Sequence, residues 1–320
     1  MQMPAVALAA AAGRRKWTVE TAQKLEQAGF QGIFCASFGD GMGLCLSIAH
    51  ATNEIKFGTS IIPIYYRVPF DLAQSAAYIH EISDGRFYLG IGVSHGPANA
   101  RLGVKTGKPL TDIRNYVEAM RASSQQTGPL PPIVLATLRK KMVELSVEIA
   151  EGAVWANASR SHIEDSLSHI PAEKCAGDFF IGDMIPTCID DNDPAAAANV
   201  MKRVLSGYVI LPNYRNYWKE AGYVEEMEAI EAALERRDRE ALPGLMTERW
   251  LSDATLYGTR KQVMEGLEEW FAKGMKTPIL VPSSTSGGQV KAVAELFAAV
   301  ACRNGRGLGT MRQCSLKNSR

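Results

Sequence analysis

Several sequence motifs that mark common catalytic sites are missing from this chain of 320 residues. It has no GxxxxGK(S/T) phosphate-binding loop, no HExxH zinc-binding helix and no GxSxG nucleophile turn. These absences argue against a P-loop nucleotide hydrolase, a zinc protease of that type and an α/β-hydrolase. The glycine-rich candidate GIGVSH, residues 90–95, lacks the third glycine with which a Rossmann fold packs its helix close to its strand.

A cysteine or histidine pattern for a disulfide framework or a metal site is lacking too. The six cysteines are scattered and include no CxxC pair, so they are predicted to be buried or incidental thiols in a reducing compartment. The five histidines are too dispersed along the chain to indicate a metal site. No metal is therefore expected.

The chain has neither a large net charge of one sign nor a long apolar run. The formal net charge is +1, so nothing indicates a nucleic-acid partner or an anionic membrane surface. No apolar run is long enough to span a bilayer. In the alanine-rich start, AVALAAAAGRRKW, the positive charges follow the apolar residues, which is the wrong order for a signal peptide. A cytoplasmic protein is expected, with a buried first strand over Pro4 to Ala10.

The stretch from Phe57 to Pro97 is the most informative part of the chain. An apolar, β-branched run over 55–62 predicts a buried strand, helical spacing after Pro69 predicts a helix to Ile82, and Phe87 to Val93 predicts a second strand. A short βαβ connection makes the two strands parallel neighbours. Their C-terminal ends then point to the same side of the sheet, where such folds build their sites.

Strands and helices alternate along the rest of the chain, without hairpin signals. Further strands are predicted over 32–36, 133–136, 152–156, 179–189 and 277–281. Ser123 to Pro132 is expected to be a surface connection, because it contains two Gly/Pro clusters. The pattern favours a parallel sheet closed by helices. One domain is expected over 1–302, followed by a disordered basic tail over 303–320.

The segment 190–256 contains more chain than one connecting helix needs, so it is predicted to be a helical insertion. It holds five aromatics close together: Tyr208, Tyr214, Tyr217, Trp218 and Tyr223. Loops on the catalytic side of a barrel vary while the barrel stays fixed, which favours an insertion over the site. The alternative is a helical hairpin packed on the outside with its aromatics buried as core.

Four motifs between the third and fourth strands carry a family resemblance. They are GTSI from Gly58, RxPxxLAQ from Arg67, an acidic-Gly-Arg-Phe turn at Asp84, and LGIG from Leu89. In this order and spacing they resemble the luciferase-like monooxygenase superfamily, and a weaker similarity spans roughly residues 3 to 300. The resemblance implies a single TIM (β/α)₈ barrel that binds a flavin or a deazaflavin.

The resemblance also implies a reaction class. The expected protein is an FMN-dependent oxidoreductase or monooxygenase acting on an apolar organic small molecule, as a homodimer and with a separate flavin reductase. One alternative is hydride transfer with the deazaflavin coenzyme F420, and another is a non-catalytic flavin-binding protein. An aldolase or a metal-dependent hydrolase would need a Schiff-base lysine or convergent ligands at the strand ends, and neither is found.

Residues near the ring follow from the same resemblance. The ring is expected to contact Ser37 and the segments Ser60-Ile61-Ile62 and Gly92-Val93-Ser94, with a non-proline cis peptide bond within 59–62. His95 follows the strand end where some deazaflavin dehydrogenases place a glutamate. An imidazole can exchange a proton near neutral pH, so His95 is a candidate proton donor or hydrogen-bonding group; alternatively it only ties the loop together.

The sequence offers three candidate sites for the cofactor phosphate and four residues for contact with the substrate. Backbone N–H groups at a helix start, with a nearby cation, could bind the phosphate at Arg139, at Arg160 or at Gly258-Thr259. The residues expected to contact substrate are Tyr65, Tyr214, Tyr217 and Trp218. Where glucose-6-phosphate dehydrogenases of the superfamily carry an Asp-His pair, this chain has Ala36-Ser37-Phe38, which argues against sugar-phosphate oxidation.

Overall fold

In the part of the chain that the structure describes, ten strands form one sheet, most of which closes on itself into a barrel. The structure, a computed structural model, describes residues 2–37 and 39–303. The strands are β1 (Ala5–Leu8), β2 (Gly32–Ala36), β3 (Lys56–Ser60), β4 (Ile62–Pro63), β5 (Phe87–Gly92), β6 (Ile133–Ala136), β7 (Gly152–Ala156), β8 (Phe180–Ile189), β9 (Leu256–Gly258) and β10 (Thr277–Ser283).

Barrel closure is made by β10, which pairs in parallel with both β1 and β8. The other neighbours follow the order β1-β2-β3-β5-β6-β7-β8, with β4 continuing β3 alongside β5, and all pairings are parallel. Eight strand positions close the ring, and β9 pairs only with the far end of β8. The predicted TIM barrel is confirmed.

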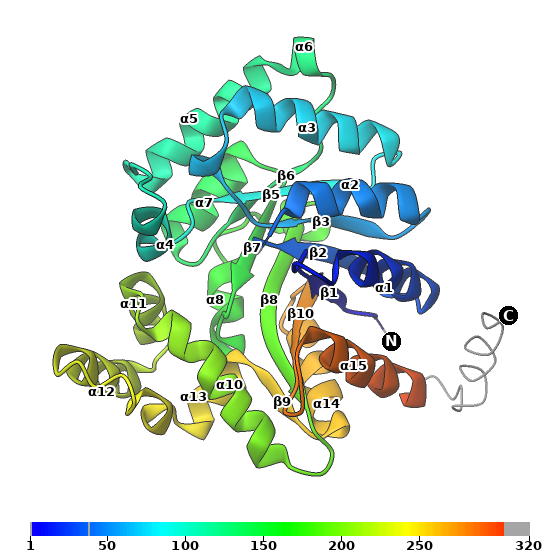
Figure 1. The fold of residues 1–320 in the computed structure, drawn as a ribbon. Helices are drawn as coiled ribbons and strands as arrows, with labels where there is room; N and C mark the ends of the chain where they lie inside the picture. The colour runs from blue at the N-terminus through cyan, green and yellow to red at the C-terminus, as the bar shows by residue number, and fades with distance from the viewer. Residues whose placement is uncertain (1, 38, 304–320) are drawn as a thin grey trace, which may run out of the picture.

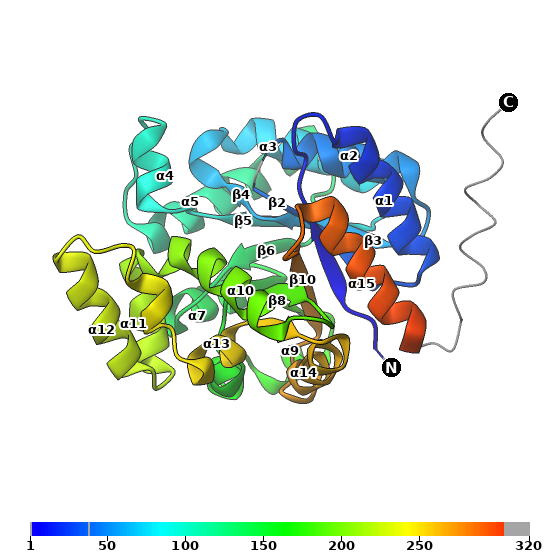
Figure 2. The same ribbon diagram turned by 60° about the horizontal axis from the view of Figure 1, so that its bottom comes forward.

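Helices surround this barrel (Figures 1 and 2). The longer ones are α1 (Arg15–Gln27), α2 (Gly41–Ala51), α3 (Pro69–Ile82), α5 (Pro109–Ala122), α7 (Lys140–Ile149), α10 (Pro194–Val209), α14 (Arg260–Ala272) and α15 (Gln289–Arg303). Short ones are η1 (Ile64–Tyr66), α4 (Gly96–Arg101), α6 (Ser124–Thr127), η2 (Arg160–His162), α8 (Ile163–Leu167) and α9 (Ala172–Ala176). No helix in the described ranges is long and apolar enough to cross a membrane.

Between β8 and β9 the chain forms α10 and then α11 (Pro212–Glu220), α12 (Val224–Glu235), η3 (Leu242–Leu245) and α13 (Glu248–Ala254). Figures 1 and 2 both show this group together on one side of the barrel. Tyr214, Tyr217, Trp218 and Tyr223 are buried, which is the packing expected of the core alternative. The strand β9, at the end of the predicted 190–256 insertion, was not predicted, because three residues show no periodicity.

One predicted surface connection contains a helix that was not predicted. The connection 123–132 contains the short helix α6, which ends at Gly128 with φ 94°. Four residues ahead of this glycine are enough for a single turn, and the Gly/Pro clusters lie after that turn. From residue 304 on, the tail predicted to be disordered lies outside the described residues.

Candidate functional site

The barrel interior contains two layers of different size. Toward the N-terminal ends of the strands the interior is filled by Phe34, Tyr88 and Phe180, whose rings contact one another at centroid distances of 5.1 and 5.6 Å. Val134 and Val154 belong to the same interior cluster. This packed layer closes the lower end of the barrel.

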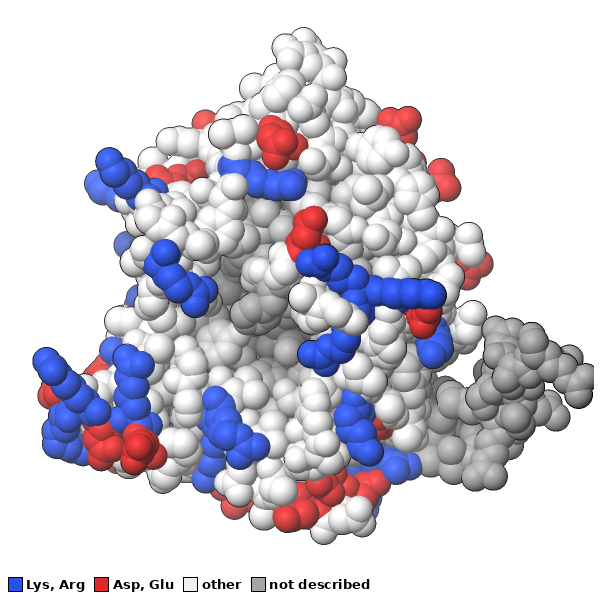
Figure 3. Space-filling view, in the orientation of Figure 1, with Lys and Arg blue, Asp and Glu red and all other residues white. Residues whose placement is uncertain are grey.

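The next layer toward the C-terminal ends is built from small residues. Side chains of a strand alternate between two faces, so the residues two or four positions beyond the interior cluster also point inward. They are Ala36, Gly92, Ala136, Ala156 and Ser283. All but Gly92 are partly exposed although they end buried strands. The face drawn in Figure 3 is hollowed near its middle, with Lys and Arg side chains around the hollow.

Gly92 is required by a close approach of neighbouring strands. A Cβ atom at this position would lie 2.7 Å from the Ala136 Cβ and 3.1 Å from the Ile61 Cδ1. Gly90 shows the same on β5, where a Cβ atom would lie 2.0 Å from the Thr59 carbonyl oxygen. Glycine therefore lets β3 and β5 approach beside the hollow.

The segment between β3 and β4 lies at this point. The peptide bond between Ser60 and Ile61 is cis, as expected for 59–62. Ile62 pairs with Ile91, and the Thr59 hydroxyl donates to the Gly90 carbonyl at 2.7 Å. Ser60 and Ile61 are both partly exposed, whereas Ile62 is buried. Ser60 and Ile61 thus lie beside Gly92 at this point of the barrel.

The loop after β5 is fixed by local contacts. Ser94 has a left-handed backbone with φ 58°, and its hydroxyl lies 3.4 Å from that of Tyr66. The buried Asn99 amide donates to the Val93 carbonyl at 3.0 Å. His95 then takes the N-cap position of α4. These contacts fix the backbone of the loop, from which its side chains project.

His95 packs against two tyrosines of the α10–α11 region. Its ring centroid lies 6.2 Å from that of Tyr208 and 5.8 Å from that of Tyr214, both in edge-on arrangements. Burial lowers the pKa of the imidazole below its ordinary value of 6.5. At neutral pH His95 is therefore uncharged, and it can accept a proton at one ring nitrogen while the other donates a hydrogen bond.

Tyr65 and Ser37 occupy different positions on the rim. The Tyr65 hydroxyl donates to Asp112 at 2.5 Å, and burial together with this carboxylate raises the pKa of Tyr65 to about 12. Asp112 also accepts from the Gly107 amide at 2.9 Å, so this pair fixes the loop before α5. Ser37 is exposed in the loop that follows β2.

The two arginines expected at a phosphate both have carboxylate partners. Arg139 forms a bidentate ion pair with Glu220 of α11. Arg160 lies 3.1 Å from Glu269 of α14. The third candidate, the start of α14, is capped by the Thr259–Gln262 capping box and by Asp191, which accepts from the Arg260 amide at 2.7 Å.

Tyr217 and Trp218 lie deeper than His95. The Tyr217 hydroxyl accepts from the Ser159 amide at 3.1 Å, and the Trp218 indole donates to the Asn157 carbonyl at 3.2 Å. Both side chains are almost fully buried. They hold α11 on the loop after β7, whereas Tyr214 extends the contact to His95.

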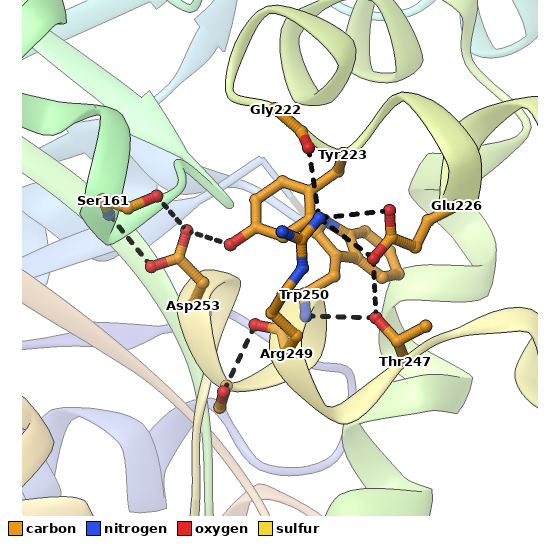
Figure 4. Close-up of polar contacts among 9 residues, drawn as sticks. Ser161, Gly222, Tyr223, Glu226, Thr247, Arg249, Trp250 and Asp253 are labelled. Atoms are coloured by element: carbon orange, nitrogen blue, oxygen red, sulfur yellow. Dashed lines mark hydrogen bonds and ion pairs between the residues drawn. The ribbon is translucent and has the colours of Figure 1, made fainter.

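A second anchor ties α12 and α13 to the same loop (Figure 4). Asp253 accepts from the amide and hydroxyl of Ser161 at 2.9 and 2.7 Å, and from the Tyr223 hydroxyl at 2.8 Å. Glu226 accepts from the Thr247 hydroxyl at 3.0 Å and pairs with Arg249. The helical group is therefore fastened at two points, which gives Tyr208 and Tyr214 a fixed support beside the hollow.

Another pocket opens at the opposite end of the barrel. Its volume is about 170 Å³, and its lining includes Gln31, Lys56, Tyr88 and Lys276. It lies below the packed aromatic layer, away from the strand ends where TIM barrels carry their chemistry. In the described ranges, no group of His, Cys, Asp and Glu could hold a metal ion.

Two features of the rim were not predicted as site residues. Tyr208 was noted as one of five aromatics, but its contact with His95 comes from packing between distant segments. Arg14 is the N-cap of α1, Arg15 and Lys16 are its first two residues, and all three are exposed. In the sequence they belong to GRRK, residues 13–16, the same positive charges whose position after the apolar start argues against a signal peptide.

Comparison with known proteins agrees with this architecture. Residues 4–277 match the luciferase-like monooxygenase family. A putative coenzyme F420-dependent oxidoreductase of Mycobacterium tuberculosis is 23% identical, over 85% of this chain and 91% of its own length. A 5,10-methylenetetrahydromethanopterin reductase of Methanolobus tindarius is also 23% identical, with the same coverage.

Solved structures share the fold at lower identity. The coenzyme F420-dependent tetrahydromethanopterin reductase of Methanopyrus kandleri superposes with a TM-score of 0.74 at 18% identity, over 95% of this chain and 99% of that one. The oxygenating constituent of the Pseudomonas putida 3,6-diketocamphane monooxygenase, solved with FMN, gives 0.59 at 13%, over 93% and 96%. The chain thus belongs to the luciferase-like monooxygenase family, a family of oxidoreductases.

Proposed function

We propose that this protein is an oxidoreductase that binds the tricyclic ring of a flavin-type cofactor in the hollow at the C-terminal end of its barrel. The observation that carries this proposal is the layer of Ala36, Gly92, Ala136, Ala156 and Ser283 above a packed aromatic floor. Small residues at the ends of five of the converging strands, four of them partly exposed, leave space for a flat, largely apolar ring. When bound, the cofactor supplies the electrons or the hydride.

The chain's own residues position the ring and the substrate. Ser60, Ile61 and Ile62 lie on one side, and Gly92, Val93 and Ser94 continue along the same edge. Tyr65 and Tyr214 stand toward the expected substrate side, with Tyr217 and Trp218 supporting the latter from below. The substrate we propose is an apolar organic small molecule, because the neighbouring side chains are aromatic and uncharged.

His95 is proposed to exchange a proton with the substrate or to hydrogen-bond the ring. Its imidazole is neutral at neutral pH, has no hydrogen-bond partner in the described part of the chain and stands in the loop after β5. A base with a lowered pKa accepts a proton only briefly and releases it readily, which suits transfer within a turnover. His95→Gln should lower turnover while leaving cofactor affinity within about two-fold.

FMN and the deazaflavin F420 are the two cofactor candidates. FMN with a separate flavin reductase and a monooxygenase reaction follows from the family, and an FMN-bound relative shares the fold. The deazaflavin candidate is favoured by the names of the F420-dependent relatives in Mycobacterium tuberculosis and Methanopyrus kandleri. A homodimer is proposed for either case.

Equilibrium titration of the purified protein with each cofactor tests the proposal. Quenching of ring fluorescence should show micromolar binding of FMN or of F420, and the one bound defines the reaction class. Binding without turnover by any reductant would support a non-catalytic flavin-binding protein. If neither ring binds, the hollow is not a cofactor site and the proposal is wrong.

A further inference from the structure

Four buried polar side chains of β7, β8 and the loop after β7 have hydrogen-bonding atoms without a partner in the described part of the chain. The atoms are Trp155 Nε1, Asn157 Nδ2, Ser159 Oγ and Asp183 Oδ2, and each residue is at most 2% exposed. A buried polar atom that makes no hydrogen bond destabilises the folded state. Inside proteins such atoms are bonded by ordered water molecules, which typically make three hydrogen bonds each. The four side chains therefore indicate a site for internal water.

The register of the sheet places these side chains together. Trp155 of β7 is the direct neighbour of Asp183 of β8, and both point outward, because the residues next to them in sequence belong to the interior cluster. The Ala158 amide donates to Asp183 Oδ1 at 3.4 Å, which brings the loop that carries Asn157 and Ser159 to the carboxyl. A water molecule here can accept from the Trp155 indole and donate to Asp183 and Ser159, which completes the three bonds.

Two tyrosines connect this polar group to the hollow. Burial raises the pKa of Tyr208 and of Tyr214, and the side chain of Asn157 lowers it in part, so this amide faces both hydroxyls. The Asn157 nitrogen nevertheless makes no direct hydrogen bond. On their other side, the rings of the two tyrosines contact His95 edge-on. The tyrosine pair therefore lies between the buried polar group and the imidazole beside the hollow.

Asp183 is the titratable member of the buried group. Burial raises its pKa to about 7, and two backbone amides lower it in part, so at neutral pH the carboxyl holds a proton about half of the time. Facing it on α11 are Tyr214 and Tyr217, whose pKa values are raised by burial and further by this carboxyl. Tyr208 of α10 stands beside Tyr214, and beside Tyr217 stand His162 of η2 and Asp253 of α13. The groups that face the carboxyl directly are thus neutral.

We propose that Asp183 is a positioning residue that exchanges protons with His95 through ordered water and the Tyr214 hydroxyl. One ring nitrogen of His95 gives its proton to the molecule in the hollow, while the other takes the Tyr214 hydroxyl proton. Tyr214 takes a proton from water, and water takes one from Asp183, which is left as a carboxylate and later regains a proton along the same path. Only the two ends of the relay change charge. The proposal rests on the proposed role of His95 in proton exchange.

The test is NMR of the protein without cofactor, over a pH range that spans 7. The Trp155 indole N–H resonance and the His95 ring resonances should each show an inflection near pH 7, where Asp183 ionises. Asp183→Asn should abolish both inflections. Tyr214→Phe keeps the ring but interrupts the relay, so it should abolish the inflection at His95 and keep the one at Trp155.

Tyr223→Phe is the matched control, because it removes a buried tyrosine hydroxyl from the same group of helices at the Asp253 anchor. It should keep both inflections. A high-resolution crystal structure of the wild type should in addition show a water molecule bonded to Trp155 Nε1 and Asp183 Oδ2.

Resonances of Trp155 and His95 that do not respond around pH 7 would overturn the proposal, as would a crystal structure without that water. An inflection at His95 that persists in Tyr214→Phe would assign it to the electric field of the carboxylate, which also contradicts the relay. Failure of the proposed function is distinguishable, because then neither FMN nor F420 binds the wild type. The NMR titration needs no bound ring, so it still decides whether Asp183 and His95 are connected.

Discussion

The two ends of the barrel interior are built from the same strands and yet differ in what they contain. Toward the N-terminal ends, Phe34, Tyr88 and Phe180 fill the cross-section with contacting rings. Two to four residues further along, β2, β5 and β7 contribute Ala36, Gly92 and Ala156. Large buried rings contribute free energy of folding through the area that they remove from water, whereas alanine and glycine contribute little.

This difference assigns stability to one layer and binding to the other. A barrel filled throughout by bulky residues would have no room for a ligand, and one lined throughout by alanine would lack a core. Substitutions in the two layers should therefore have opposite signatures: loss of stability without loss of binding below, and loss of binding without loss of stability above. The predictions below test that separation.

Phe34→Ala should have the largest effect. Phe34 is only 4% exposed, and removing its ring leaves a cavity in the floor, so the free energy of unfolding should fall by about 3–5 kcal/mol. Urea denaturation measures this change, and Phe34→Leu should lose less than half as much. Cofactor affinity, titrated well below the denaturation midpoint, should stay within about two-fold of the wild type. A variant that loses binding but little stability would show that the layers are not separate.

Ala156→Phe should give the reverse pattern. The new ring would project into the hollow from β7, so binding of the cofactor ring should weaken by about 100-fold or more, which is roughly 2.7 kcal/mol. The free energy of unfolding should change by less than about 1 kcal/mol, because the ring enters open space instead of a packed core. Ala156→Ser is the matched control and should bind normally. Normal binding by Ala156→Phe would place the cofactor elsewhere.

Much of this barrel was predictable from the sequence, and the limits of prediction are physical. The strands over 32–36, 133–136 and 152–156 and the helix over 69–82 have the predicted bounds, since continuous apolar runs and helical periodicity define them well. The short helices α4 and α6 and the strand β9 were not predicted, because so few residues show no hydrophobic periodicity. The carboxylate partners of Arg139 and Arg160 could not be predicted either, because they come from helices that are distant in the sequence.

The layer of small residues at the C-terminal ends of the strands was not predicted for a different reason. Ala36, Ala136 and Ala156 look like ordinary strand ends, and their shared level in the barrel depends on the register between strands. The contact of His95 with Tyr208 joins segments that are separated in the chain by three strands, β6, β7 and β8. Resemblance to a family supplied the cis bond at Ser60–Ile61 and the loop of His95, which periodicity alone could not.

Asp183 extends the comparison to the outer side of the barrel wall. It is fully buried, its Oδ2 atom has no hydrogen-bond partner among the described residues, and burial raises its pKa to about 7 from 3.8, although the amides of Ala158 and Met184 lower it in part. Between about pH 4 and 7 the unfolded chain is ionised while the folded protein still holds the proton. The stability that this group contributes is therefore fully present below about pH 4, is lost progressively as pH rises, and is gone once pH has passed 7.

Asp183→Asn should remove that loss, because the amide has the same shape and does not ionise. Relative to wild type, the variant should gain on the order of 2 kcal/mol between pH 5 and pH 8, because only the span from pH 5 to pH 7, about two pKa units, contributes in this range. Urea denaturation at the two pH values measures the difference. A gain of equal size at both pH values would mean that the carboxyl does not titrate in this range. Asp183→Ala, which leaves a cavity, should lose stability at both.

The smallest effect is expected at His95, where burial lowers the pKa below 6.5. As pH falls through 6.5 the unfolded chain takes up a proton that the folded protein does not, so stability should fall. Titration of the imidazole by NMR gives the midpoint directly. Tyr208→Ser should admit water beside the ring and raise this midpoint toward 6.5, whereas Tyr208→Phe keeps the burial and should leave it unchanged. If both variants behave alike, Tyr208 does not shield the imidazole, and its edge-on contact with His95 is incidental to the site.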